Sequence, residues 1–175
     1  MQFSQTAVAV FGVYFKIQSF VNMPASGLIQ GMRPIVSYNY GAGNKDRIKQ
    51  VMRASLNVVG AIMIVGMCLF IGFGRPIMEV FSQDEAMIAM GVSALRISSA
   101  SFVFSAFGSV VSCTFEAFGQ GFFSLLITFF RQLVVVPLFA FGLSAAIGLE
   151  GFWLAFPAAE LLGAGCAFII GKKAL

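Results

Sequence analysis

The sequence alternates between long apolar stretches and short polar segments. A helix needs about 20 mostly apolar residues to cross the roughly 30 Å core of a bilayer, because lipid offers no partner to a free backbone polar group. Stretches of this kind occur at residues 6–38, 54–73, 87–115, 121–147 and 151–170. The pattern therefore predicts an all-α polytopic membrane protein, with about five transmembrane helices in a single transmembrane domain over residues 1–175.

The first stretch is the most polar one and contains Pro24. It is too long for one straight crossing, and proline removes a helical hydrogen bond, so we expect a kinked or tilted helix interrupted near Pro24. A broken helix beside a cavity exposes carbonyls that can coordinate an ion or a substrate. The pathway candidates on this stretch are Lys16, Gln18, Asn22 and Gln30. In the competing interpretation, Lys16 snorkels and Arg33 marks the cytoplasmic boundary.

The third stretch carries serines at steps of three or four residues, a spacing that puts them on one helical face. The series is Ser98, Ser101, Ser105, Ser109 and Ser112, followed by Glu116. Polar groups in a membrane usually face a bundle interior or a water-filled cavity, so Ser101, Ser105 and Glu116 are candidates for an ion or substrate pathway. Alternatively, the serines let a neighbouring helix pack closely and Glu116 lies at the cytoplasmic interface.

Glu160 lies in the middle of the fifth stretch, and no basic residue is near it in the sequence. A carboxyl group in apolar surroundings is suited to hold and release a proton, so Glu160 is a candidate coupling residue. It could equally be a neutral structural acid, or the ion-pair partner of Arg131 or Lys16 across the bundle. Arg131 itself is expected to be a structural anchor near the cytoplasmic face.

The distribution of Lys and Arg predicts the orientation in the membrane, since cytoplasmic loops are enriched in both. The loop after the first stretch contains Lys45, Arg47, Lys49 and Arg53, and the tail contains Lys172 and Lys173. The acidic loops fall on the opposite side, and residues 75–90 are expected to form a short interfacial helix there. We therefore expect a multi-pass protein of the cell membrane with a cytoplasmic C-terminus.

Composition excludes several classes of function. Hydrophobic residues make up 59% of the chain and charged residues 10%, which is too apolar for a soluble domain. The chain has no His, so metal-dependent and His-dependent enzymes are not expected, nor is a bound cofactor. The basic residues behind the net charge of +4 cluster mainly at particular loops and are not spread over a soluble face, which argues against nucleic acid binding. Membrane lipid is an expected partner.

Four segments resemble the multidrug and toxic compound extrusion family, the MATE transporters. The run IQGMRPIVSYNYGAGNKDRI (29–48) resembles the family's G..P..GYNYGA segment and the basic loop that follows it. The preceding FGVYFKIQSFVNMPASGL (11–28) is similar to its eighth helix. FEAFGQGFFSLLITFFRQLVVVPL (115–138) resembles the junction of helices ten and eleven, and GFWLAFPAAELL (151–162) resembles helix twelve. The resemblance runs in order over essentially the whole chain.

This resemblance implies helices eight to twelve of a twelve-helix antiporter, and thus part of one six-helix lobe. Such a carrier exchanges Na⁺ or H⁺ for organic, often cationic or amphipathic, compounds that move outward. The expected partners are a small organic substrate and the missing lobe, in the same chain or in a partner chain. The 14% aromatic content suits such substrates through apolar and cation–π contacts.

The chain departs from the family pattern in its tenth helix, where some members carry an acid and this chain carries serines with an acid only at the end. One alternative is a lipid-linked oligosaccharide flippase of the same superfamily, whose anionic substrates require more cationic residues around the cavity. Another is a truncated membrane fragment that does not transport.

Overall fold

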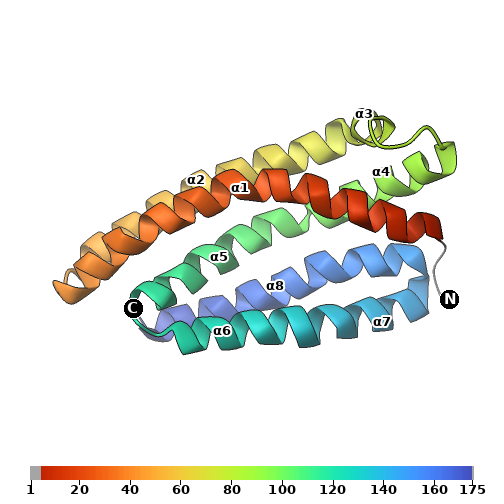
Figure 1. Cartoon of the computed structure of the whole chain (residues 1–175). Helices are drawn as coiled ribbons and strands as arrows, with labels where there is room; N and C mark the ends of the chain where they lie inside the picture. Colours follow the sequence, from red (N-terminus) through yellow and green to blue (C-terminus); the bar gives the residue numbers. More distant parts are fainter. Residues whose placement is uncertain (1–4, 175) are drawn as a thin grey trace.

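The computed structural model describes residues 5–174, except for the side chains of residues 123, 127 and 167–174. Every regular element in this range is a helix, so the predicted all-α fold is confirmed. The first two helices are α1 (Gln5–Gly41) and α2 (Lys45–Gly72), which run antiparallel (Figure 1). Gly43 has a φ of 68° in the turn between them, a conformation that suits glycine. The Asn44 side chain then accepts a hydrogen bond from the backbone N–H of Arg47 and starts α2.

Helix α1 continues through both of its prolines, Pro24 and Pro34. The expected interruption at Pro24 is therefore wrong. A proline removes one helical hydrogen bond and its ring crowds the carbonyl four residues earlier, a local cost that contacts elsewhere along the helix can offset. Buried contacts on both sides of Pro24, at Tyr14 and Met32, hold the helix against the bundle.

A short helix, α3 (Gly74–Glu79), lies between α2 and α4 (Glu85–Ser99) at the N-terminal end of the bundle (Figure 1). It occupies only the start of the predicted interfacial segment. Arg75 joins the two helices through ion pairs of 2.8 Å to both Glu79 and Glu85. The hydrogen bond to Glu79 and the charge of Glu85 raise the pKa of the Arg75 guanidinium above its usual value.

The third predicted span is bent in the structure. Helix α4 ends at Ser99, α5 (Ser101–Ala117) follows after Ala100, and their axes differ by 43°. At the bend the hydroxyl of Ser101 donates to the carbonyl of Ser98 at 2.6 Å, and Ser99 donates to the carbonyl of Arg96. Serine hydroxyls that bond to preceding carbonyls often accompany helix bends. The break that we expected in the first span therefore lies in the third.

The fourth predicted span is a composite helix of α6 (Gly121–Phe129), the π-helix η1 (Phe130–Val135) and α7 (Val136–Ile147). Pro137 stands just after η1 and cannot donate the helical hydrogen bond to the residue four positions earlier. The wider π-helical turn lies where that bond is missing, as π-bulges commonly do. Gly148, with a φ of 73°, connects α7 to α8 (Leu149–Ala174).

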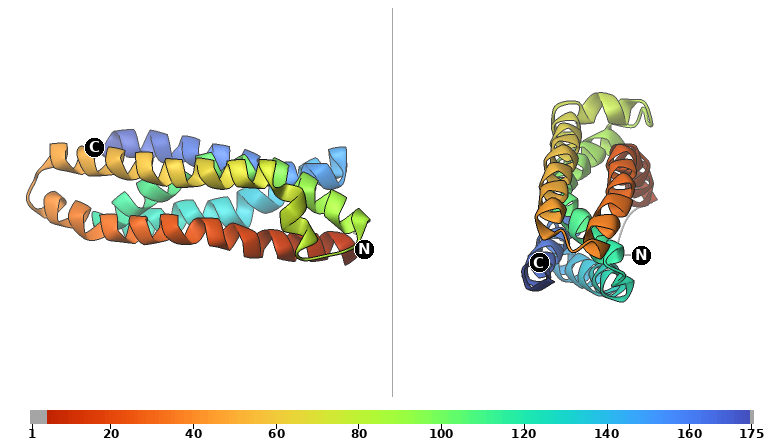
Figure 2. Two further views of the ribbon diagram at one scale, coloured as in Figure 1. Left: turned by 90° about the horizontal axis from the view of Figure 1, so that it is seen from above. Right: turned by 90° about the vertical axis from the view of Figure 1, so that its left-hand side faces the viewer.

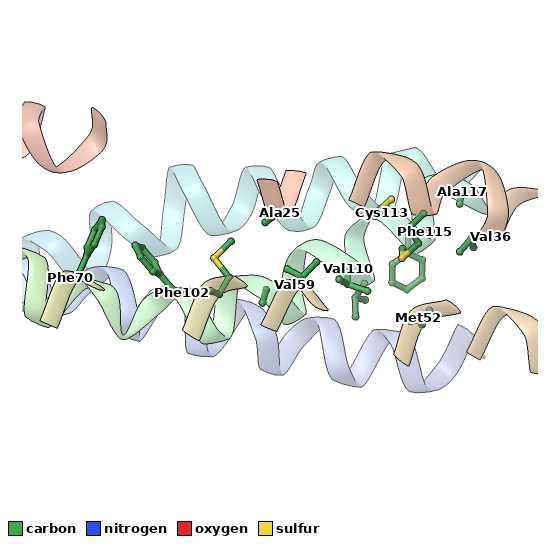
Figure 3. Packing of buried hydrophobic residues seen from close by; sticks show 14 of the residues in the cluster. Ala25, Val36, Met52, Val59, Phe70, Phe102, Val110, Cys113, Phe115 and Ala117 are labelled. Atoms are coloured by element: carbon green, nitrogen blue, oxygen red, sulfur yellow. The ribbon is translucent and has the colours of Figure 1, made fainter. Parts of the chain in front are cut away.

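The long helices lie roughly parallel or antiparallel in one elongated bundle (Figure 2). Within it, α5 packs against α1, α2 and α8. Buried apolar residues from α1, α2, α4 and α5 form a continuous core, which includes Val36, Val59, Phe70, Phe102 and Val110 (Figure 3). A second cluster around Trp153 contacts Val10 and Ala94. The turn between α1 and α2 lies at the same end as the end of α8, opposite the start of α1 (Figure 1).

The described helices include several that are long and apolar enough to cross a membrane. They are α2, residues 124–147, and the bent pair α4 and α5 if it counts as one span. Much of their apolar surface is exposed, for example Val65 on α2 and Phe141 on α7. This surface suits lipid contact, in keeping with a polytopic membrane protein.

Candidate functional site

A polar cavity of about 200 Å³ lies between α1, α5, α6, η1 and α8. The residues that line it come from all five elements: Ile29, Arg33, Gly108, Ser109, Ser112, Cys113, Glu116, Thr128, Arg131 and Gly163. Charged side chains are rare in the apolar bundle, so their concentration around one cavity makes it the candidate functional site.

One ion pair borders the cavity between α1 and α5, where Arg33 donates to Glu116. The other carboxylate oxygen, Glu116 Oε1, accepts a hydrogen bond of 2.9 Å from the hydroxyl of Ser124 on α6. Ser124 Oγ also lies 2.5 Å from Ser112 Oγ on α5. Glu116 therefore connects α1, α5 and α6 through one carboxylate.

A second ion pair lies deeper in the bundle. Arg131 Nη1 donates to Glu160 Oε2 at 2.8 Å, which links η1 to α8. These two side chains are 18% and 20% exposed, against 50% and 35% for Arg33 and Glu116. Charges with less solvent around them interact more strongly and are harder to leave unpaired, so the pair of Arg131 and Glu160 is the more tightly coupled one.

Two glycines make room for Arg131. A Cβ atom at Gly163 of α8 would lie 2.6 Å from Arg131 Cδ, and one at Gly108 of α5 would lie 3.2 Å from Arg131 Nη1. The arginine therefore passes between two helices at positions without side chains. Its Nε is buried and has no hydrogen-bond partner among the described residues, so one donor of the guanidinium is unsatisfied within that part of the chain.

Comparison with known proteins shows which family the chain belongs to. The family model described as MatE matches residues 1–141. The chain belongs to the MatE family. Among its relatives, the multidrug export protein MepA of Staphylococcus aureus (strain NCTC 8325 / PS 47) is 29% identical over 164 residues, covering 94% of this chain and 36% of MepA. MepA of Staphylococcus saprophyticus is 25% identical over the same length.

Solved structures show the same fold. An outward-facing multidrug resistance MATE family transporter of the MOP superfamily superposes with a TM-score of 0.93, at 22% identity, over 99% of this chain and 39% of that transporter. A MOP superfamily transporter from Pyrococcus furiosus gives 0.91 at 23% identity, over 97% of this chain and 39% of that one. The MatE chain thus spans little more than a third of the length of these relatives.

The structure separates the pathway candidates on α1 from the cavity of this MatE chain. Lys16 and Gln30 are exposed, Gln18 and Asn22 are half-buried, and none of the four lines the cavity. Arg33, which sequence reasoning favoured as a boundary residue, does line it.

The serine series divides in a similar way. Ser101 and Ser105 donate to carbonyls of the preceding turn, Ser98 and Phe102, and lie away from the cavity. Only Ser109 and Ser112, further along the same face, reach the lining together with Glu116.

Glu160 has Arg131 as its partner, one of the alternatives left open by the sequence. Ser124, Thr128 and the two glycines are site residues that sequence reasoning missed. A weak signal existed for two of them, because Ser124, Thr128 and Arg131 follow one another at three- or four-residue steps and so share a face of the helix.

Proposed function

We propose that this MatE chain is part of a cation-coupled multidrug efflux antiporter. It would export organic cationic or amphipathic compounds in exchange for Na⁺ or H⁺. Family membership and similarity to proteins named multidrug export protein support export of such compounds. The observation that carries the coupling part of the proposal is the polar cavity inside an otherwise apolar bundle. Arg33 and its partner Glu116 line this cavity, as does Arg131, which is paired with Glu160.

Each pair can act as a two-state element. When a carboxylate takes up a proton, or when Na⁺ competes for it, the arginine loses its attraction and can turn toward another partner. The helices that the pair joined are then less tightly coupled. For Glu160 the affected contact lies between η1 and α8, and for Glu116 it lies between α1, α5 and α6.

Transport requires the remainder of the carrier. The chain corresponds to 36% of the length of MepA, so a rocking motion of two lobes needs a first lobe from the same or a partner chain. We place the protein in the cell membrane with the basic turn and the C-terminus in the cytoplasm. The arrangement of the bundle supports this topology, since both lie at one end (Figure 2).

A lipid-linked oligosaccharide flippase is the second candidate function. Two arginines and one glutamate line the cavity, and this cationic excess favours an anionic substrate. Both arginines are paired with carboxylates, however, which leaves little free positive charge for a phosphate group. We therefore retain the efflux function as the leading proposal.

The test is efflux of a fluorescent organic cation such as ethidium from cells that carry the full-length gene, with Na⁺ and pH gradients imposed separately. We expect efflux to follow one of the two gradients, and Glu160→Gln to weaken this dependence more than Glu116→Gln. Efflux that ignores both gradients would refute antiport. Absence of efflux from cells with verified expression of the carrier would instead favour the flippase or a fragment without transport activity.

A further inference from the structure

A second hollow lies on the outside of the bundle, as an apolar groove of about 330 Å³ between α1 and α2. Gly31 is part of its wall, and because nothing lies within 4 Å of a Cβ placed there, the missing side chain leaves space. The other walls are mostly aliphatic and include Leu28, Met32 and Ile35 of α1 and Val51, Ala54 and Val58 of α2. Such a surface suits a hydrocarbon chain.

The groove is separate from the polar cavity. On α1, Ile29 and Arg33 line the cavity, whereas Leu28 and Met32 line the groove, so the two hollows use different faces of one helix. Ile35 and Val58 at the groove are 48% and 46% exposed, so it opens to the surroundings of the chain rather than to the bundle interior. In a membrane those surroundings are lipid wherever the rest of the carrier does not cover them.

Arg47 and Tyr38 lie toward one end of the groove, the end near the basic turn. Arg47 lies four residues before Val51 on α2, which places it on the same helical face at the end near the basic turn. Its guanidinium hydrogen-bonds to Gln50 and forms no ion pair with a described acid. Tyr38, three residues after Ile35 on α1, is 78% exposed. Tyrosine is enriched at the membrane–water interface, and arginine is enriched in the cytoplasmic loops next to it.

We propose that this groove binds an anionic phospholipid, with one acyl chain along the apolar walls and the phosphate at Arg47. A planar guanidinium can donate two hydrogen bonds to a phosphate, and basic pockets between helices at the membrane surface are known to hold anionic headgroups. The hollow of about 330 Å³ and its mostly aliphatic walls suit a single hydrocarbon chain. The site extends the proposed function, since the lipid is not the transported compound.

The full-length carrier, purified in detergent, tests the proposal with phosphatidylglycerol that carries a photoreactive acyl chain and with the matching phosphatidylcholine. We expect crosslinking to α1 and α2 along the groove, with a clear preference for phosphatidylglycerol. Arg47→Gln should weaken phosphatidylglycerol binding about tenfold, which corresponds to one charge-assisted contact. Arg53→Gln is the matched control, because two residues beyond Val51 the side chain points to the other side of α2. It should change binding less than about twofold.

Ala54→Phe fills the groove and should reduce crosslinking of both lipids. If Ala54→Phe fails to fold, Ser55→Leu is the second variant that fills the groove, with the same expected result. Equal labelling by the two lipids would overturn the proposal, as would equal effects of Arg47→Gln and Arg53→Gln, since both results mean unspecific attraction to the membrane surface. A photoreactive residue at Ala54 that crosslinks to another part of the carrier would also overturn it, because the groove would then be covered by protein.

Discussion

Gly163 offers a direct test of how Arg131 reaches Glu160. A methyl group at this position would lie 2.6 Å from Arg131 Cδ and 3.4 Å from Cγ, closer than atoms in contact normally approach. Any shift of the arginine that relieves this contact moves a side chain whose far end is held by Glu160 at 2.8 Å. Gly163→Ala should therefore displace Arg131 from its carboxylate.

The expected cost follows from three contributions. Replacing glycine by alanine in a helix stabilises by about 0.5–1 kcal/mol. Forcing a methyl group into a filled site costs about 1–3 kcal/mol. Disrupting a fully buried ion pair costs about 3–5 kcal/mol, but side chains that are 18% and 20% exposed recover part of this through solvent. The net destabilisation should be about 1–3 kcal/mol.

Gly165→Ala is the control on the same helix, since nothing lies within 4 Å of a Cβ at that position. The apparent melting temperature of the purified full-length protein should fall by several degrees for Gly163→Ala and stay level or rise for Gly165→Ala. Adding Gly163→Ala to Arg131→Ala should cost little more than Arg131→Ala alone, because the clash has then been removed. Equal melting temperatures for the two glycine variants, or fully additive losses in the double variant, would refute this account of the site.

Two further variants probe neighbouring contacts by the same melting assay. Ser124→Ala removes the hydroxyl that donates to Glu116. It should destabilise by about 0.5–1.5 kcal/mol, because the hydrogen bond is lost but solvent reaches the 35% exposed carboxyl side chain and replaces part of it. An unchanged melting temperature would contradict this. Gly66→Ala would place a methyl group 2.3 Å from Cγ1 of Val21, a stiff β-branched side chain, so about 1–3 kcal/mol should be lost where α1 and α2 meet. Gly60→Ala, with open space around it, is the control, and its melting temperature should stay level or rise.

The sequence predicted the helices well and their irregularities poorly. Residues 121–147 form a helical segment with the predicted bounds, because nearly every residue there prefers lipid or protein to water. The break expected at Pro24 lies instead at Ala100, where no proline or glycine stands. A proline allows a kink without requiring one, and the packing of both sides of the helix decides whether it forms.

The candidate site shows the same division. Arg33 and Glu116 are 83 residues apart, and Arg131 and Glu160 are 29 apart, so no local pattern pairs them. Sequence reasoning identified both acids because a carboxyl group in an apolar stretch is costly without a role. It could leave only alternatives for their partners, since a partner depends on which helices become neighbours and on how each is rotated about its axis.

By itself, the sequence determined that this chain is a set of apolar helices with rare polar residues that need a reason to be there, and it pointed to the MATE family. These properties depend on the transfer of each residue into lipid and on helical spacing, which are local quantities. Only the tertiary structure decided that Glu160 meets Arg131 rather than Lys16, that the serine series divides between helix carbonyls and the cavity, and that α1 stays continuous. The physical reason is that contacts between distant helices depend on where each helix axis lies and how each helix is rotated about it. They also depend on positions without side chains, such as Gly108 and Gly163, and the packing of all the helices decides where these positions meet.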